Sequence, residues 1–314
     1  RMMGHAPDRT DDLPAGVGPL PASVLALVAD VAAQLGPALR SLALFGSCIP
    51  SRTHATQPHG VPDLLALIDD HAQDDVLRAL GCPARARRLA AHLPPLTWAY
   101  APRGPVQAKL NIVGARVAAA QIGASRDLYL TGRISKLLLI CYARDAACRA
   151  ELTALSQQAA QQMARWVVLG LPPRSTLTGA VRACIALSYR AELRPEGARK
   201  LHQIYDRFAD FYDAHFGPHL LAAAMENGFA YEPTQGLLLH PSTPAHAPQR
   251  VRARAALGWL LMRSRLRSAL RWPKQMIVYR GWFSYVRDKW RRARRWSSAS
   301  RASGTSGSAR SRLP

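Results

Sequence analysis

Residues Ser41 to Asp70 read SLALFGSCIPSRTHATQPHGVPDLLALIDD, and this stretch decides the fold. A short apolar run leads into the turn Gly46-Ser47, a polar loop follows, and a second apolar run begins at Asp63. Short apolar runs bounded by turn residues predict buried strands, here at 42–45 and 64–68. Glycine lets a backbone approach a phosphate closely, and the following N–H groups and the serine hydroxyl can hold phosphate oxygens. The stretch therefore predicts two neighbouring strands and a nucleotide-binding turn.

Asp63 is the candidate metal ligand of this stretch. Mg²⁺ prefers carboxylate oxygens and bridges to substrate phosphates, so an aspartate that opens a strand beside a phosphate-binding turn suits it. A plain turn aspartate after Pro62 is the alternative. Asp69 and Asp70 end the same run. At about 3.3 Å per residue Asp69 lies about 20 Å from Asp63, too far to share a metal, so we interpret the pair as a solvated strand end.

Composition adds a second clue, which is charge. The chain has 314 residues, of which 48% are hydrophobic, and a formal net charge of +22. This length and hydrophobic content predict two globular domains and exclude general disorder. Between residues 250 and 296 the chain has fifteen Lys or Arg and one acid, Asp288. Such a segment indicates a polyanionic partner, either a phospholipid surface or a nucleic acid.

The basic segment is also amphipathic. Aromatic and apolar residues recur on one face of a predicted helix and arginines on the other, a pattern typical of helices that lie in a membrane interface. RNA binding through the same charges and a plain docking helix are the alternatives. The chain contains no apolar run of about 18 residues, so no transmembrane helix is expected. The candidate membrane-binding residues are Tyr279, Trp282, Phe283 and Trp290.

The remaining pattern predicts an α+β protein. Further strands are expected at 97–100 and 106–113, and helices at 23–35, 117–122, 134–144, 147–169, 176–189 and 198–215. The five cysteines have no C-x-x-C spacing, which favours reduced thiols over a disulfide or zinc framework. The expected organisation is a disordered N-terminus (1–21), a mixed-sheet core (22–115), a mostly helical domain (116–217), a linker (218–249), the amphipathic tail (250–296) and a disordered end (297–314).

Three more motifs carry a family resemblance. They are Lys109-Leu-Asn-Ile-Val113, Asp127-Leu-Tyr-Leu-Thr-Gly-Arg-Ile-Ser-Lys136 and Leu187-Ser-Tyr-Arg-Ala-Glu-Leu-Arg194, followed by Lys200. Together with the turn and the Asp63 run they resemble, in the same order, the peripheral phosphatidate cytidylyltransferases of mitochondria and bacteria, which belong to the nucleotidyltransferase superfamily. Most of that superfamily has a second carboxylate two residues after the first, where this chain has Leu65, and the lipid-directed branch ordinarily lacks it.

The resemblance implies a nucleotidyltransferase-fold mixed sheet, a winged-helix-like second domain and Mg²⁺-dependent transfer from CTP to phosphatidic acid. It also implies a peripheral location on an anionic membrane, at the bacterial cytoplasmic face or the matrix side of the mitochondrial inner membrane, with nucleic acid an unfavoured partner. The implied catalytic residues are Asp63, Lys109, Arg133 and Lys136, with Asp63 as the metal ligand and Gly46, Ser47, Arg194 and Lys200 as nucleotide-binding residues.

Some family positions have no counterpart. The Trp-His pair and the His-Tyr-Ser stretch that usually follow the Asp-Asp pair are absent from 70–93, and Glu192 replaces an Asp. Glu192 and Glu196 are interpreted as partners of Arg194 and Lys200, or else as a second metal-ligand pair. Two other functions stay open. One is an enzyme of this fold with a polynucleotide or protein acceptor, and the other is a catalytically silent protein that binds lipid or RNA.

Overall fold

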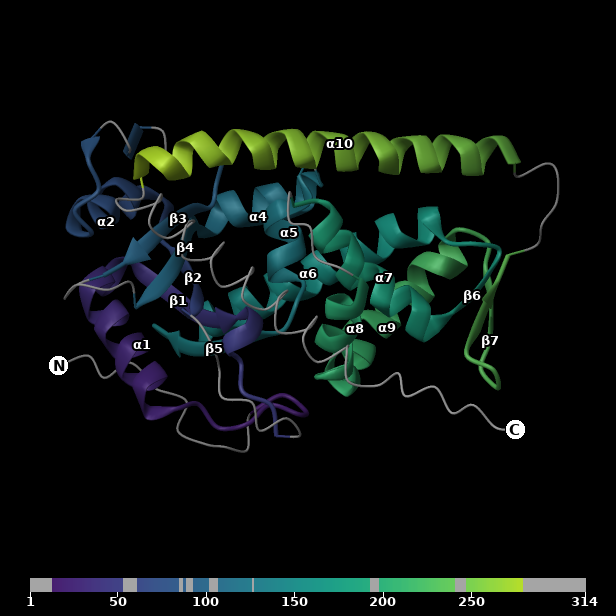
Figure 1. The fold of residues 1–314 in the computed structure, drawn as a ribbon, viewed down its shortest axis with the longest axis horizontal. Helices are drawn as coiled ribbons and strands as arrows, with labels where there is room; N and C mark the ends of the chain where they lie inside the picture. Colours follow the sequence, from purple (N-terminus) through teal and green to yellow (C-terminus); the bar gives the residue numbers. More distant parts are fainter. Residues whose placement is uncertain are drawn as a thin grey trace, which may run out of the picture.

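The structure is a computed structural model that describes residues 13–52, 61–84, 87–88, 93–101, 107–125, 127–192, 198–240 and 247–278. It has an α+β architecture with two sheets (Figure 1). The strands are β1 Leu39–Phe45, β2 Asp63–Ile68, β3 Leu96–Tyr100, β4 Ala108–Gly114, β5 Leu138–Ala143, β6 Arg174–Thr176, β7 Ala230–Glu232 and β8 Leu237–Leu239. The α-helices are α1 Ala22–Leu35, α2 Gln73–Ala79, α4 Ala115–Ala124, α5 Leu128–Ile134, α6 Ala146–Gly170, α7 Leu177–Arg190, α8 Ala198–Asp206, α9 Ala209–Glu226 and α10 Ala247–Val278.

The larger sheet is mixed and has the strand order β3-β4-β2-β1-β5. Strands β2 and β4 run parallel, and the other neighbours run antiparallel. Phe45 pairs with Asp63, and Asp63 pairs with Lys109. The end of β1 and the starts of β2 and β4 therefore meet at one edge of the sheet. The strands expected from the sequence at 42–45, 64–68, 97–100 and 106–113 all belong to this sheet.

Strand β5 corrects the expected helix at 134–144. Helix α5 ends at Ile134, and the chain then returns to the sheet to pair with β1. Side chains along β5 alternate between half-buried and buried, which is the period of a strand. The half-buried positions are apolar as well, so the run shows no polar alternation in the sequence. The larger sheet therefore includes a strand that lies beyond residue 115, the expected end of the mixed-sheet core.

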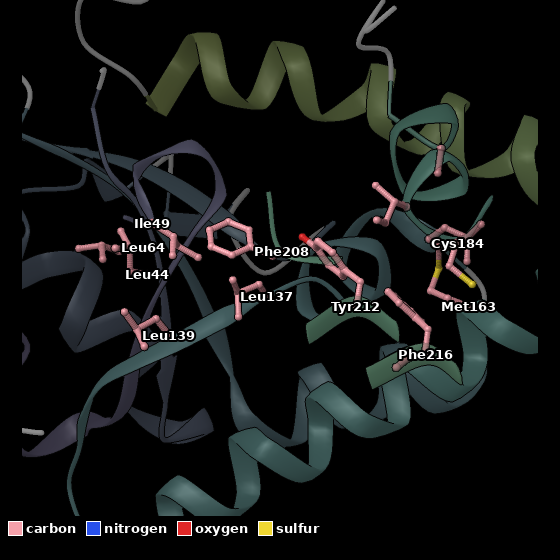
Figure 2. Close-up of a cluster of buried hydrophobic side chains, with 14 of the residues drawn as sticks. Leu44, Ile49, Leu64, Leu137, Leu139, Met163, Cys184, Phe208, Tyr212 and Phe216 are labelled. Atoms are coloured by element: carbon pink, nitrogen blue, oxygen red, sulfur yellow. The ribbon is translucent and has the colours of Figure 1, made fainter. Parts of the chain in front are cut away.

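One hydrophobic core joins the sheet to the helices. Figure 2 shows side chains of β1 and β2 at one end of the cluster and side chains of α6, α7 and α9 at the other, with Phe208 and Tyr212 between them. Leu44, Leu64 and Phe216 in this cluster have no exposed surface. Burial on this scale stabilises a large side chain by roughly 2 kcal/mol, so this cluster contributes strongly to holding the sheet and the helices together.

The segment 218–249 is not simply a linker. Helix α9 continues through Pro218 to Glu226, and β7 and β8 then pair with β6 in a three-stranded antiparallel sheet. A proline inside a helix removes one backbone hydrogen bond, which is why a break was expected here. Burial of His215, Phe216 and Leu220 on either side of the proline offsets that loss. The helix expected at 198–215 is divided into α8 and α9 near Arg207.

Asp69 and Asp70 are structural residues, which corrects their interpretation as a solvated strand end. Asp69 forms ion pairs at 2.8 Å with Arg40 and with Arg144, and the hydrogen bond from Arg144 lowers the Asp69 pKa most. Asp70 accepts hydrogen bonds from the backbone N–H groups of Arg116 and Val117 at the start of α4. An acid in the first turn of a helix satisfies N–H groups that have no partner inside the helix.

Helix α10 lies along one side of the molecule, from the α2 end to the β6 end (Figure 1). Among the residues that the structure describes, no helix is both long enough and apolar enough to cross a membrane.

Helices α5 and α7 cross at a glycine. A Cβ atom at Gly132 would lie 2.7 Å from the Cβ atom and 3.0 Å from the Cα atom of Ser188, closer than such atoms approach in proteins. Two of the motifs that were recognised separately in the sequence thus touch here, because Gly132 belongs to the segment 127–136 and Ser188 to the segment 187–194.

We predict that Gly132→Ala destabilises the protein by about 1–3 kcal/mol, because the added methyl group must push α5 away from α7. The free energy of unfolding in urea measures this. The matched control is Gly258→Ala, at an exposed position of α10 where a Cβ atom meets nothing within 4 Å. That variant should be neutral or more stable by up to about 1 kcal/mol, since alanine favours a helix. Equal losses in both variants would contradict the close crossing.

Candidate active site

The candidate site begins at the sheet edge where β1, β2 and β4 meet. The Lys109 Nζ atom lies 3.8 Å from the Asp63 Oδ1 atom, and both side chains are about one-fifth exposed. On the other side, a Cβ atom at Gly46 would lie 3.7 Å from the Asp63 Oδ2 atom. The strand register explains this grouping, because Asp63 pairs with Lys109 on β4 and with Phe45, the residue before Gly46, on β1. A carboxylate, an ammonium group and an exposed glycine turn thus adjoin.

The turn after β1 has a defined backbone. Gly46 has a φ of 83°, a left-handed conformation that glycine adopts without strain. Arg207, at the junction of α8 and α9, donates hydrogen bonds to the carbonyl oxygens of Ser47 at 3.3 Å and Ile49 at 2.5 Å. Arg207 thus holds the carbonyl oxygens of this turn, while Gly46 and Ser47 are exposed to solvent. Such a turn suits the binding of an anionic ligand by backbone N–H groups.

Arg133 is the buried cation of the site, with only 7% of its surface exposed. One guanidinium nitrogen donates to Asn111 Oδ1 at 3.1 Å, and another donates to Glu192 Oε2 at 3.4 Å. Burial opposes the charge, but attraction to Glu192, Tyr129 and Asp63 outweighs it, so the pKa of Arg133 is raised above its ordinary value. Arg133 is therefore a fixed positive charge whose field reaches Asp63.

Aromatic rings support both cations of the 127–136 segment. The Arg133 guanidinium lies 4.3 Å from the centroid of the Tyr129 ring, and Tyr129 also contacts the Arg271 guanidinium of α10 at 4.2 Å. Lys136 Nζ lies 4.2 Å from the centroid of the Tyr189 ring on α7. Stacking on aromatic faces limits the rotamers of these long side chains and attracts their positive charges.

Leu65 lies two residues after Asp63, at the position where the sequence resemblance led us to look for a second carboxylate. Its side chain is 2% exposed and belongs to an apolar cluster that also contains Phe45 and Leu67. Asn111 of β4 pairs with Leu65 of β2, and the Asn111 side chain accepts a hydrogen bond from Arg133. An amide and a guanidinium thus lie beside this position. Within the described part of the chain no three metal-ligating side chains form a cluster.

The residues present fit a Mg²⁺ ion that is held by a single protein carboxylate. Mg²⁺ keeps several waters and is usually held by one or two carboxylates together with substrate phosphates. Asp63 supplies one such carboxylate, partly exposed and next to the turn. Glu192 does not serve as a second one here, because it is 7% exposed and pairs with Arg133. Arg194, which the sequence suggested as a partner of Glu192, lies outside the described residues.

The structure thus brings together Gly46, Ser47, Asp63 and Lys109, places Arg133 against Asn111 two residues further along β4, and holds Lys136 on Tyr189. Arg194 and the predicted membrane-binding residues lie outside the described residues, and so does Glu196. Lys200 is in α8, but its side chain is not described. The predicted membrane-binding residues are Tyr279, Trp282, Phe283 and Trp290.

Sequence reasoning missed four residues of the site, which are Asn111, Tyr129, Arg207 and Arg271. Asn111 carried a usable signal, because an amide in the middle of an apolar strand needs a buried partner. Tyr129 lies inside a recognised motif, but no role was predicted for it. Arg207 and Arg271 carried no such signal, since each reaches the site from a helix distant in sequence, and arginines are usually solvated.

Comparison with known proteins adds no relative. No protein-family model matches this chain, and no curated protein matches it significantly.

We predict strong coupling between Arg133 and Glu192. Arg133→Met leaves the buried Glu192 carboxylate uncompensated, and Glu192→Gln leaves the buried Arg133 guanidinium uncompensated. Each change costs about 3–5 kcal/mol of unfolding free energy. The double variant should lose clearly less than the sum of the two single losses. A double-mutant cycle in urea measures the difference.

The matched control is the ion pair of Arg182 with Asp206 at 3.2 Å, whose side chains are about half exposed. Its coupling should stay below about 1 kcal/mol, because solvent screens exposed pairs. Additive losses for Arg133 and Glu192 would contradict a buried, mutually dependent pair.

Proposed function

We propose that the protein is a Mg²⁺-dependent CTP:phosphatidate cytidylyltransferase that makes CDP-diacylglycerol and pyrophosphate. One observation carries the proposal. Side chains from separate motifs converge at one sheet edge, where Asp63 and Lys109 adjoin the glycine turn and Arg133 projects its charge toward Asp63.

The chemistry of the reaction matches this set of groups. A phosphate oxygen of phosphatidate attacks the α-phosphorus of CTP, the bond to the bridging oxygen of the β-phosphate breaks, and pyrophosphate leaves. The attacking phosphate monoester has a second pKa of about 6, so it is already ionised near neutral pH and needs no general base. Catalysis then requires positioning and neutralisation of phosphate charge, which fixed cations supply.

Each residue has a role under this proposal. The Gly46-Ser47 turn binds triphosphate oxygens, and Lys109 and Lys136 contact phosphate groups of the two substrates. Asp63 binds Mg²⁺, which would neutralise charge on the triphosphate. Arg133 adds a fixed positive charge beside Asn111. Its two partners, Asn111 and Glu192, keep the guanidinium in place.

The arrangement of the chain agrees with the proposed fold type. A mixed sheet whose glycine turn follows one strand and whose acid opens the next is the arrangement expected of a nucleotidyltransferase domain. Helices α6, α7 and α9 together with the small sheet β6-β8-β7 are compatible with a winged-helix-like second part. The five cysteines are buried and form no disulfide.

The test is a transfer assay with purified protein, radiolabelled CTP, Mg²⁺ and phosphatidate vesicles. We expect a lipid-soluble CDP product, and we expect Asp63→Asn to lower its rate by about 100-fold or more because the metal carboxylate is lost. Asp30→Asn, at an exposed acid of α1, is the matched control and should keep the wild-type rate.

Two results would decide against the proposal. RNA or protein that gains a nucleotide while no lipid product forms would assign the fold to another acceptor. A wild-type rate in the Asp63→Asn variant would remove Asp63 from the metal site.

A further inference from the structure

Helix α10 has an exposed apolar stripe on its outer side. Within the described residues, seven large hydrophobic side chains are strongly exposed, and five of them belong to this helix. At 100° per residue these five fall on one face, which extends for about 28 Å along the helix. They are Val251, Trp259, Met262, Leu266 and Leu270, with exposed fractions from 53% to 67%.

The stripe is bordered by positive charge. Helix α10 contains eight Lys or Arg and no acidic residue in its sequence. On the helical projection Arg263 lies at one border of the stripe, and Arg254 and Arg265 lie at the other. Arg254 and Arg265 are exposed. An apolar stripe with a tryptophan, flanked by arginines, is the composition of a helix that lies in a membrane interface.

The opposite side of α10 is fastened to the body of the protein. Arg271, which is 2% exposed, donates to the Asp127 carboxylate and to the Pro94 carbonyl oxygen. Ser264 Oγ accepts a hydrogen bond from the Leu128 N–H group at 3.1 Å. Leu260 and Leu261 are buried in the main core. The outer stripe is therefore presented by a helix whose inner face is fixed, and it is not needed to hold the helix in place.

We propose that the outer face of α10 is a docking surface for an anionic lipid bilayer. The charge pattern favours this occupant over a second copy of the chain, because two such faces in contact would bring arginines of like charge together. It also favours a bilayer over a nucleic acid, since phosphates would pair with the arginines but leave the apolar stripe in water. A bilayer accepts both parts, with the apolar stripe among the acyl chains and the arginines at the headgroups.

The docking surface lies close to the candidate site. Arg271 on the inner face of α10 and Arg133 of the site contact the same ring, that of Tyr129, at 4.2 Å and 4.3 Å. One side chain thus separates α10 from the buried cation. Resting on the proposed function, this contact implies that α10 holds the site next to the surface from which a lipid substrate is taken. The sequence predicted membrane contact for the segment 250–296, which includes most of α10, but the residues named for that contact lie beyond residue 278 and the stripe residues were not among them.

The test is vesicle flotation of the full chain, measured as a partition coefficient. The probe vesicles are phosphatidylcholine alone and phosphatidylcholine with 30% phosphatidylglycerol. We expect binding to the anionic vesicles and at least ten-fold weaker partition for the double variant Trp259→Ser/Leu266→Ser. The matched control is Leu25→Ser/Met225→Ser, which removes the two exposed apolar side chains outside α10 and should partition as the wild type does. Arg254→Gln/Arg265→Gln should weaken partition to anionic vesicles and leave neutral vesicles unaffected.

Several results would overturn the proposal. They are failure of the wild type to float with anionic vesicles, undiminished flotation of the stripe variant, or an equal loss in the control variant. A wild-type dimer in sedimentation that the stripe variant alone abolishes, with flotation unchanged, would assign the face to a second copy. RNA binding that weakens in the stripe variant while flotation does not would assign it to nucleic acid. Flotation requires neither CTP nor turnover, so a failure of the cytidylyl-transfer assay leaves this test intact.

Discussion

The buried guanidinium of Arg133 is the interaction on which the rest of the structure depends. A charge removed from water costs several kcal/mol unless it is paired, and here Glu192 and Asn111 provide the pairing. Asn111 belongs to the sheet, Arg133 to α5, and Glu192 follows α7. Three elements that are distant in sequence must therefore come together before this charge is satisfied. The same contacts fix the positive charge of Arg133, which attracts the Asp63 carboxylate.

The other contacts of the site follow from this arrangement. Gly132 allows α5 to cross α7 closely enough for its neighbour Arg133 to reach Glu192. The Tyr129 ring contacts both Arg133 and Arg271, so helix α10 is connected to the same group of side chains. Arg133 is buried against structural partners, whereas the side chains of the nearby Lys109 and Asp63 are partly exposed. That division separates residues that hold the site from residues that can meet a ligand.

Much of the sheet could be predicted from sequence, and the contacts that complete the site could not. Short apolar runs between turns located β1, β2 and β4, whose burial on both faces leaves a clear pattern, and they also located β3, which is only partly buried along its middle. The same doubly apolar pattern hid β5, which looked helical. The role of Asp70 as a helix cap was missed because its partners begin 46 residues later, at Arg116. Pairing of Asp63 with Lys109 depends on strand order, which no local pattern encodes.

The central claim is that the sheet edge between Gly46 and Lys109 binds the triphosphate of a nucleotide, with Arg133 behind it. The most direct measurement is a crystal structure of the protein with CTP and Mg²⁺. The account predicts triphosphate density against the N–H groups of the Gly46-Ser47 turn, with Lys109 in contact and the metal on Asp63. Nucleotide density elsewhere in the molecule, or an Asp63 carboxylate that contacts neither metal nor nucleotide while CTP is bound, would contradict it.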